Sequence, residues 1–418
     1  MANSFVNTQK VANAFLLLLK NELVMGKLVN TKFDKDFSSE QIAVGDTVKV
    51  RRPPEYTVRD GADAEVQDSK TGSVDITIDK QKGVDLQFTS KELTLEVDEL
   101  LKNQNMKSQA SALAQQIDAD IVAETLKFPH WVGTPGETID SAKDFFVGPQ
   151  RMDELSIPNN DRFGILSPAD YWGLAGSLTG LNSDSTVKTA LEKAKLPLLG
   201  NVQAYMSQNV INLVTGTRVS SSAGQVDGAS QNVAYETVRT TYVQDLKLKG
   251  LASGATIKAG EVFTIAGVNA VNPANKADLG YLQMFVVQAD KEVGVDGKVT
   301  VSIANPIITT GAYQNVTSAP ANSAPVTFIG DPSTAYRQNS IFHRSSIALV
   351  GAKLVAPESG NYSFATDKET GLSVRFWRIS DGVHDTHLSR CDVLYGVKNI
   401  DPRLGIRISG QAELDITS

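Results

Sequence analysis

The sequence predicts an α+β protein in which an all-β domain interrupts a mixed region of the chain. Three observations support this prediction. A long helical stretch runs from about Thr89 to Phe128 and ends at Pro129. A charged segment with little apolar content, 49–70, is followed by alternating strand patterns. Between 216 and 330, short Val, Ile and Thr runs are separated by Gly, Asn and Pro without helix-length periodicity.

Composition is that of an ordinary globular protein. The 418 residues suggest two or three domains at about 100–200 residues per domain. Hydrophobic residues make up 41% and charged residues 21%, which excludes disordered, collagen-like and coiled-coil chains. The net charge of -7 repels phosphates, so a dedicated reader of DNA or RNA is not expected.

Cysteine content and apolar runs bear on location. Cys391 is the only cysteine, so an intrachain disulfide and a cysteine-based zinc site are both excluded, and a reducing compartment fits best. The apolar run from Val11 to Leu19 is too short to cross a bilayer. It also lacks the basic start and small-residue cleavage site of a signal peptide, so we expect neither membrane insertion nor secretion.

Residues 8–29 are predicted to form a helix. Phe15 and Leu19 lie on its apolar stripe, and Leu17 and Leu18 widen the apolar surface beyond that stripe. Two interpretations follow: an ordinary core helix, or an N-terminal arm that docks on another subunit through Phe15 and Leu19. Composition favours the core helix.

The charged segment 49–70 cannot bury itself. It contains five basic and five acidic residues. The runs 74–78 and 84–88 alternate with period two around a predicted turn at 80–83, so we expect a long β-hairpin arm that projects from the body. Its charges form either a solvated surface or complementary contacts with a neighbouring copy.

Local signals predict three further elements. The long helix is one-faced, with an apolar side made of Met106, Ala110, Leu113, Ile117 and Ile121. Ser167 is predicted to cap a helix that begins at Pro168. Strands 284–287 and 299–303 are predicted to form a hairpin, with Asp296 and Gly297 in a type I′ turn.

Catalytic and metal-binding signals are weak. His384 and His387 are the only close histidine pair, and a zinc site would need a further ligand. Ser389, Asp385 and His387 could be written as a triad, but such residues within five positions are common in surface loops. Nucleophile-elbow, zinc-protease, EF-hand and phosphate-loop motifs are absent. We therefore expect no enzyme, no metal site and no cofactor.

The C-terminal third resembles a known family. The runs FHRSSIALV (342–350) and RFWRISDGVHDTHLSRCDVLYGVKNIDPRLGIRISGQ (375–411) resemble the end of the P22-type major coat proteins of tailed bacteriophages. GEVFTIAGV (260–268) and LSPADYW (166–172) agree as well. The matching segments run in the same order over nearly the whole chain.

This resemblance implies the HK97-like capsid fold with an inserted β-barrel domain. The expected parts are an N-terminal arm (1–40), an E-loop β-hairpin with flanking strands (41–90), a P-domain spine helix with the first part of the A-domain (91–215), the inserted β-barrel (216–330), and the remainder of the A-domain and P-domain (331–418).

The resemblance also implies a function. The chain is expected to assemble in the host cytoplasm into an icosahedral shell of pentamers and hexamers, the virion capsid, around double-stranded DNA without sequence specificity. A scaffolding protein and a portal protein are the implied partners. Two alternatives remain open: another virion structural or decoration protein, and a soluble carbohydrate-binding or hydrolase domain.

Contacts between copies are expected in the E-loop and the N-terminal arm. The candidate residues are Arg51, Arg52, Glu55, Arg59, Asp60, Glu65, Phe15 and Leu19. Charge reversal at Arg51 and Arg52 is expected to reduce assembly without changing the circular dichroism of the monomer. The stretch 221–240 is the expected region of the loop that bridges capsomers, and covalent Lys–Asn bonds between subunits are not expected.

Overall fold

The computed structural model describes residues 8–31, 47–52, 54–56, 72–89, 104–178, 196, 198–221 and 224–411. The chain forms two compact units, which we call unit 1 and unit 2. Unit 1 comprises Met1–Val50, Asp75–Glu124 and Ile347–Lys398, and unit 2 comprises Arg51–Val74, Thr125–Ser346 and Asn399–Ser418. The chain passes between the units within β1 (Thr47–Arg51) and β2 (Ser73–Thr77), which pair as a two-stranded sheet.

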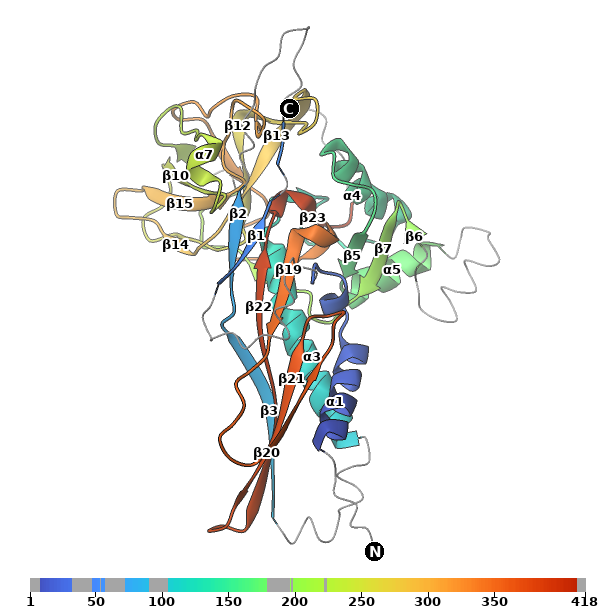
Figure 1. Cartoon of the computed structure of the whole chain (residues 1–418). Coiled ribbons are helices and arrows are strands. Elements are labelled where there is room, and N and C mark those ends of the chain that lie inside the picture. Colours follow the sequence, from blue (N-terminus) through green and yellow to red (C-terminus); the bar gives the residue numbers. More distant parts are fainter. Residues whose placement is uncertain are drawn as a thin grey trace, which may run out of the picture. The chain divides into compact units, whose positions relative to one another are not determined.

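Unit 1 is an antiparallel sheet packed against two helices (Figure 1). Its strands are β3 (Lys80–Thr89), β19 (Ile347–Ala352), β20 (Asn361–Thr366), β21 (Ser373–Asp381) and β22 (Thr386–Asn399), and its helices are α1 (Thr8–Glu22) and α3 (Gln104–Ala123), with the 3-10 turn η1 (Met25–Lys27). β22 lies at the centre and pairs with β3 and β21 over most of its length.

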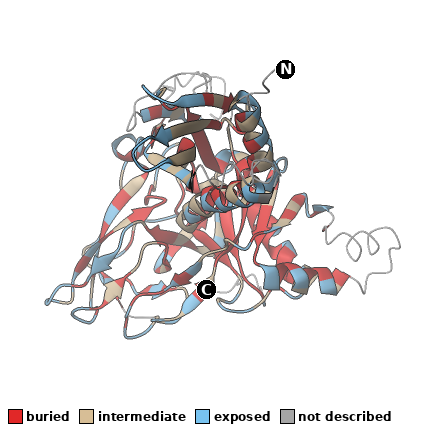
Figure 2. Cartoon of the chain, turned by 90° about the horizontal axis from the view of Figure 1, so that it is seen from below, coloured by how far each residue is buried: buried red, intermediate tan, exposed pale blue. Residues whose placement is uncertain are grey.

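Both helices of unit 1 bury one side, as their periodicity predicts. Phe15 and Leu19 of α1 are fully buried, whereas Leu17 is 60% exposed. On α3, Ala110, Leu113, Ile117 and Ile121 are buried, and the opposite side of the helix is exposed (Figure 2). α1 is therefore a core helix within the chain.

Asp118 joins the end of α1 to α3. Its carboxylate accepts hydrogen bonds from the backbone N–H groups of Val24 (2.9 Å), Met25 (3.0 Å) and Gly26 (3.2 Å). Burial raises the pKa of Asp118 to about 6, although the three N–H donors pull it in the opposite direction. This carboxylate fixes the turn at which the N-terminal helix ends.

The predicted hairpin between 74–78 and 84–88 is wrong. β2 pairs with β1, and β3 pairs with β22 in a register that runs from Lys80 opposite Tyr395 to Thr89 opposite Thr386. Residues 80–83 lie inside β3 rather than in a turn. A side chain at Gly83 would collide with the Asp392 carboxylate, so this glycine serves close strand approach.

Unit 2 contains a mixed six-stranded sheet in the order β4-β23-β18-β5-β7-β6. These strands are β4 (His130–Val132), β5 (Arg162–Leu166), β6 (Leu198–Leu199), β7 (Val202–Met206), β18 (Asn339–His343) and β23 (Gly405–Ile408). Two helices, α4 (Ala142–Glu154) and α5 (Pro168–Leu178), share an apolar core with it. The predicted cap is confirmed, because the Asp170 N–H donates to the Ser167 hydroxyl at 3.3 Å.

A β-barrel within unit 2 occupies the region of the predicted insert. Its main strands are β9 (Gln225–Val226), β10 (Val243–Lys249), β12 (Val262–Val271), β13 (Asp278–Val287), β15 (Val299–Ala304) and β16 (Val326–Phe328), with β11 (Thr256–Ile257), β14 (Lys291–Glu292) and the short helix α7 (Tyr235–Val238) beside them. Backbone bonds between Val226 and residues 323–324 close the sheet. Its strands share one large cluster of buried apolar residues.

The predicted hairpin is confirmed but its turn type is wrong. β13 and β15 are antiparallel, with Val286 opposite Ala304. Of the two turn residues, only Gly297 has a positive φ (71°), whereas a type I′ turn requires it of both. The Gly297 N–H donates to the Gly294 carbonyl, and the Gly294 N–H donates to the Lys298 carbonyl, which closes a longer loop with one left-handed glycine.

The ends of the barrel segment lie side by side. β8 (Asn212–Val214) and β17 (Ala335–Arg337) form an antiparallel pair. The Ser333 N–H donates to the Gly216 carbonyl at 3.0 Å. Directly inside this junction, Arg218 and Glu261 form a fully buried ion pair. The Glu261 carboxylate also accepts the N–H of Gly216.

Candidate functional site at the root of the charged arm

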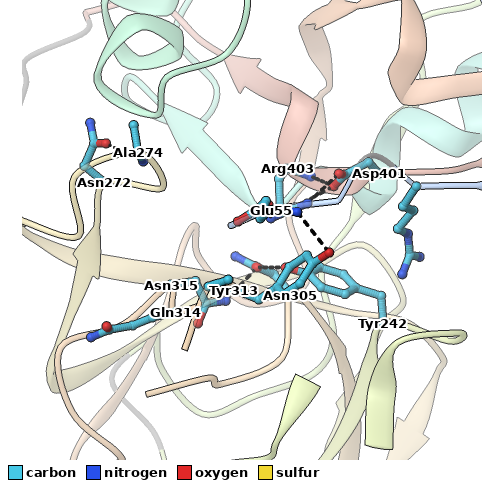
Figure 3. A network of polar contacts seen from close by, with 12 residues as sticks. Glu55, Tyr242, Asn272, Ala274, Asn305, Tyr313, Gln314, Asn315, Asp401 and Arg403 are labelled. Atoms are coloured by element: carbon cyan, nitrogen blue, oxygen red, sulfur yellow. Dashed lines mark hydrogen bonds and ion pairs between the residues drawn. The ribbon is translucent and has the colours of Figure 1, made fainter. Parts of the chain in front are cut away.

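We call residues 51–72 the arm, and its described ends (51, 52, 54–56 and 72) the arm root. The two limbs meet at the root, because the Arg52 N–H donates to the Gly72 carbonyl at 2.8 Å. Side chains from the barrel and from the segment 399–403 surround Glu55 of the root (Figure 3). All of these residues belong to unit 2.

Arg52 is buried at the root of the outgoing limb. Its Nε donates to the Ile400 carbonyl at 2.8 Å, and its Nη1 donates to the Arg239 carbonyl at 3.1 Å. The guanidinium lies over the Tyr242 ring, 4.8 Å from the ring centroid. Burial lowers the pKa of Arg52, and the nearby Asp401 carboxylate opposes that shift.

Glu55 is held by three different groups. Its carboxylate pairs with Arg403 and, at 3.8 Å, with the Lys276 ammonium. Its backbone N–H donates to the Tyr313 hydroxyl at 3.2 Å (Figure 3). Two of these three partners, Lys276 and Tyr313, come from the barrel, so this limb is fastened mainly to the inserted segment.

A charged pair on the C-terminal segment supports this arrangement. Arg403 donates to both oxygens of Asp401, from Nε at 3.0 Å and from Nη2 at 2.8 Å. Burial opposes ionisation, but the charge and hydrogen bonds of Arg403 keep the pKa of Asp401 below its usual value. A bidentate arginine of this kind is a rigid platform, because its fork geometry is fixed.

Tyrosines of the barrel form the surface that receives the root. Tyr235 and Tyr313 stack with ring centroids 3.4 Å apart and planes 6° apart. Tyr242 is buried and donates its hydroxyl proton to the Asn305 side-chain oxygen at 3.3 Å. Burial raises the pKa values of Tyr235 and Tyr242, so both hydroxyls stay protonated.

Gly72 places the returning limb against the same surface. A Cβ at this position would collide with the Arg239 carbonyl and would lie 2.8 Å from the Tyr235 hydroxyl. Any side chain larger than hydrogen would therefore push the limb away. Both limbs thus contact one set of barrel residues, which we call the seat: Tyr235, Arg239, Tyr242, Lys276 and Tyr313.

The chemistry of this site is that of attachment. Ion pairs, stacked rings and backbone hydrogen bonds position a segment and activate no nucleophile. The described part of the chain contains no group of three or more residues suited to a metal ion. His384 and His387 lie at the β21–β22 turn, where His384 contacts Asp381 and His387 contacts Ser380, both at 2.7 Å. Across the described ranges, no helix is both long and apolar enough to span a bilayer.

The candidate contact residues fall into three groups. Arg52 and Glu55 are brought together at the arm root, with Arg51 exposed beside them. Phe15 and Leu19 are buried in α1. Arg59, Asp60 and Glu65 lie outside the described residues. For all of these candidates, contacts with neighbouring copies stay predictions. Within the chain, Arg52, Glu55, Phe15 and Leu19 already have partners.

Sequence reasoning missed the residues that surround the arm root. Tyr242 and Tyr313 belong to a region predicted only as β-rich, and Tyr235 falls in the stretch 221–240 that was expected to bridge capsomers. Lys276 lies in the connection between β12 and β13. A signal was present in the sequence: 299–330 contains no charged residue, yet it includes Tyr313, an aromatic with a polar group that must find a partner when buried. Its partner, Glu55, is too distant in sequence to be inferred from local patterns.

Comparison with known proteins decides the family. A family model described as "P22 coat protein - gene protein 5" matches residues 1–410. The chain belongs to the P22 coat protein family. It is a major capsid protein of a tailed bacteriophage, a structural component of the virion that forms an icosahedral shell, and not an enzyme. The HK97-like capsid fold with an inserted domain follows from this membership.

Several solved structures are similar to this coat protein. A structure from Mycobacterium phage Che8 matches at 12% identity over 94% of this chain and 92% of that chain, with a TM-score of 0.46. The mature capsid of bacteriophage PhiM1 matches at 11% identity over 92% and 90%, with a TM-score of 0.41. The CUS-3 coat protein I-domain matches at 29% identity over 26% of this chain and 95% of that chain, with a TM-score of 0.20. A search of curated protein sequences returned no match.

Proposed function

We propose that this coat protein builds its shell through contacts of the arm with neighbouring copies. One observation carries the proposal: the arm is fastened at its root, where exposed side chains lie beside the buried attachment points. Arg51 is exposed, and Tyr56, the last described residue of the outgoing limb, is 57% exposed. The segment 57–71 then carries two basic and four acidic residues. A segment that carries both charge signs suits a repeated contact between identical copies.

The partners of assembly extend this proposal. Closing a shell of defined size from one chain requires control of curvature, which a scaffolding protein supplies, and a portal protein occupies one vertex. Double-stranded DNA is the enclosed cargo, without sequence specificity. The net charge of -7 supports a container that does not grip phosphates, because strong electrostatic binding would impede packaging and release.

Charge reversal in the arm tests the contact between copies. Arg51→Glu combined with Arg59→Glu should reduce shell formation at least about tenfold, since several such contacts act together in each subunit. Arg52 is left unchanged because its burial would make reversal a test of folding. The matched control is Lys291→Glu combined with Lys143→Glu, which gives the same charge change at exposed residues of β14 and α4. Shells are counted by electron microscopy, and subunit circular dichroism must stay unchanged. Normal shell yields from the arm variant would contradict the proposal.

Expression with and without a candidate scaffolding protein from the same genome tests the partners. Closed shells with that protein, and spirals or tubes without it, would support the scaffold requirement. Uniform closed shells in both conditions would argue that the coat protein sets its own curvature.

A further inference from the structure

We propose that the seat of the inserted barrel fixes the direction of the arm, so that Tyr235, Tyr242 and Tyr313 are positioning residues for assembly. The effect on shells rests on the arm contact proposed above. The hold on the arm root itself rests only on contacts within unit 2. In this role the barrel acts on the neighbouring copy without touching it.

The outgoing limb is held at two successive points. At Arg52, the guanidinium stacks on Tyr242 and donates to the Arg239 carbonyl. Three residues later, the Glu55 backbone donates to Tyr313. A single contact would leave the limb free to rotate about it. Two attachments at different positions along the limb prevent rotation as well as displacement.

The returning limb lies against the seat because residue 72 has no side chain. The Arg239 carbonyl and the Tyr235 hydroxyl occupy the volume where a side chain of residue 72 would lie. Tyr235 is in turn fixed by its stack on Tyr313, the residue that binds the outgoing limb. The two limbs are therefore coupled through one pair of rings.

The seat is rigid because its residues are anchored in the barrel. The hydroxyl of Tyr242 binds Asn305, whose side-chain oxygen also accepts from Asn315 at 2.9 Å. Lys276 donates to the Ala312 carbonyl at 2.5 Å in addition to its pairing with Glu55. A movement of the arm thus requires either loss of these contacts or movement of the barrel.

Two substitutions loosen the seat in different ways. Tyr313→Phe keeps the ring stack but removes the hydroxyl that accepts from Glu55, and Gly72→Ala inserts a methyl group against Arg239 and Tyr235. The matched controls are Tyr362→Phe, an exposed tyrosine of unit 1, and Gly176→Ala, a helical glycine with no heavy atom within 4 Å of an added Cβ.

Hydrogen exchange of unassembled, full-length subunits measures the hold directly. Tyr313→Phe should speed exchange in peptides covering 47–56 and 72–77 by about 3- to 10-fold, the loss expected for one hydrogen bond. Gly72→Ala should speed it by at least about tenfold, as steric overpacking does. Barrel peptides from β10 and β15 should not change, and neither control should alter exchange.

Three results would overturn the inference: no change at 47–56, a change on one limb only, or an equal change throughout the barrel. The last would mean that these residues serve barrel stability alone. Assembly assays separate the two proposals. If charge reversal in the arm blocks shells while Gly72→Ala does not, the seat has no part in assembly and the inference fails. If exchange rises locally but neither the charge reversal at Arg51 and Arg59 nor Gly72→Ala affects shells, the proposed arm contact between copies fails, while the hold on the root stands.

Discussion

The buried ion pair at the base of the barrel gives a prediction whose size follows from its geometry. Arg218 and Glu261 have side-chain exposures of 0% and 1%, and burial lowers the pKa of Arg218 to about 10. Glu261→Gln keeps an oxygen for the Gly216 N–H but leaves the guanidinium without a counter-charge. We expect this variant to lose about 3–5 kcal/mol of unfolding free energy, the cost of breaking a buried pair from one side.

A matched control lies on the same barrel. Lys258 and Asp290 form an ion pair at 2.8 Å with side-chain exposures of 43% and 59%. Asp290→Asn should cost less than about 1 kcal/mol, because solvent screens an exposed pair. The double variant Arg218→Met, Glu261→Gln should recover to within about 2 kcal/mol of the native chain, since it removes the orphaned charge and keeps an apolar group on Phe328, over which Arg218 lies at 4.2 Å.

The assay should follow the barrel locally, because a chain with two compact units need not unfold in one step. Hydrogen exchange of peptides from β10 and β15 meets this need, and each increment of about 1.4 kcal/mol appears as a tenfold faster rate. If Glu261→Gln behaves like Asp290→Asn, or if the double variant is as unstable as the single one, the pair is not desolvated as described and the reasoning is refuted.

Two further predictions concern unit 1. Burial raises the pKa of Asp118 from 3.8 to about 6, so the folded chain binds this proton more tightly than the unfolded chain does. The resulting stabilisation, up to about 3 kcal/mol, is complete below about pH 4 and is lost as pH rises through about 6. Asp118→Asn should flatten that pH dependence in urea titrations; an unchanged slope would contradict the assignment. Phe15→Ala should cost about 3–5 kcal/mol, and Leu17→Ala, on the exposed side of α1, no more than about 0.5, as measured by thermal unfolding of subunits. Equal losses would mean that the buried side of α1 is wrongly assigned.

Local physics made much of the fold predictable from the sequence. The buried sides of α1 and α3 follow from apolar spacing, and the cap at Ser167 follows from a hydroxyl placed before Pro168. The β13–β15 hairpin was predictable because its strands are close in sequence and a glycine marks the turn. Each of these signals lies within a few residues of the element that it specifies.

Pairing over long distances was not predictable. Alternation indicates that 84–88 is extended but says nothing of its partner, which is β22, some three hundred positions away. Gly83 was interpreted as a turn residue because glycine also permits close approach of two backbones, and the sequence does not separate these uses. The seat was still harder to predict from the sequence, because the folding of the barrel brings Tyr313 against Tyr235 and Tyr242.

The pairing of β8 with β17 has a consequence for how this chain can be altered. Because the barrel leaves and returns through adjacent antiparallel strands, a short turn could join Val214 to Ala335 without stretching either strand. By connectivity the barrel is a removable cassette, and foreign domains with closely spaced termini could be grafted in its place. A graft would preserve the path of the chain, but its own side chains would have to bind Arg52 and Glu55.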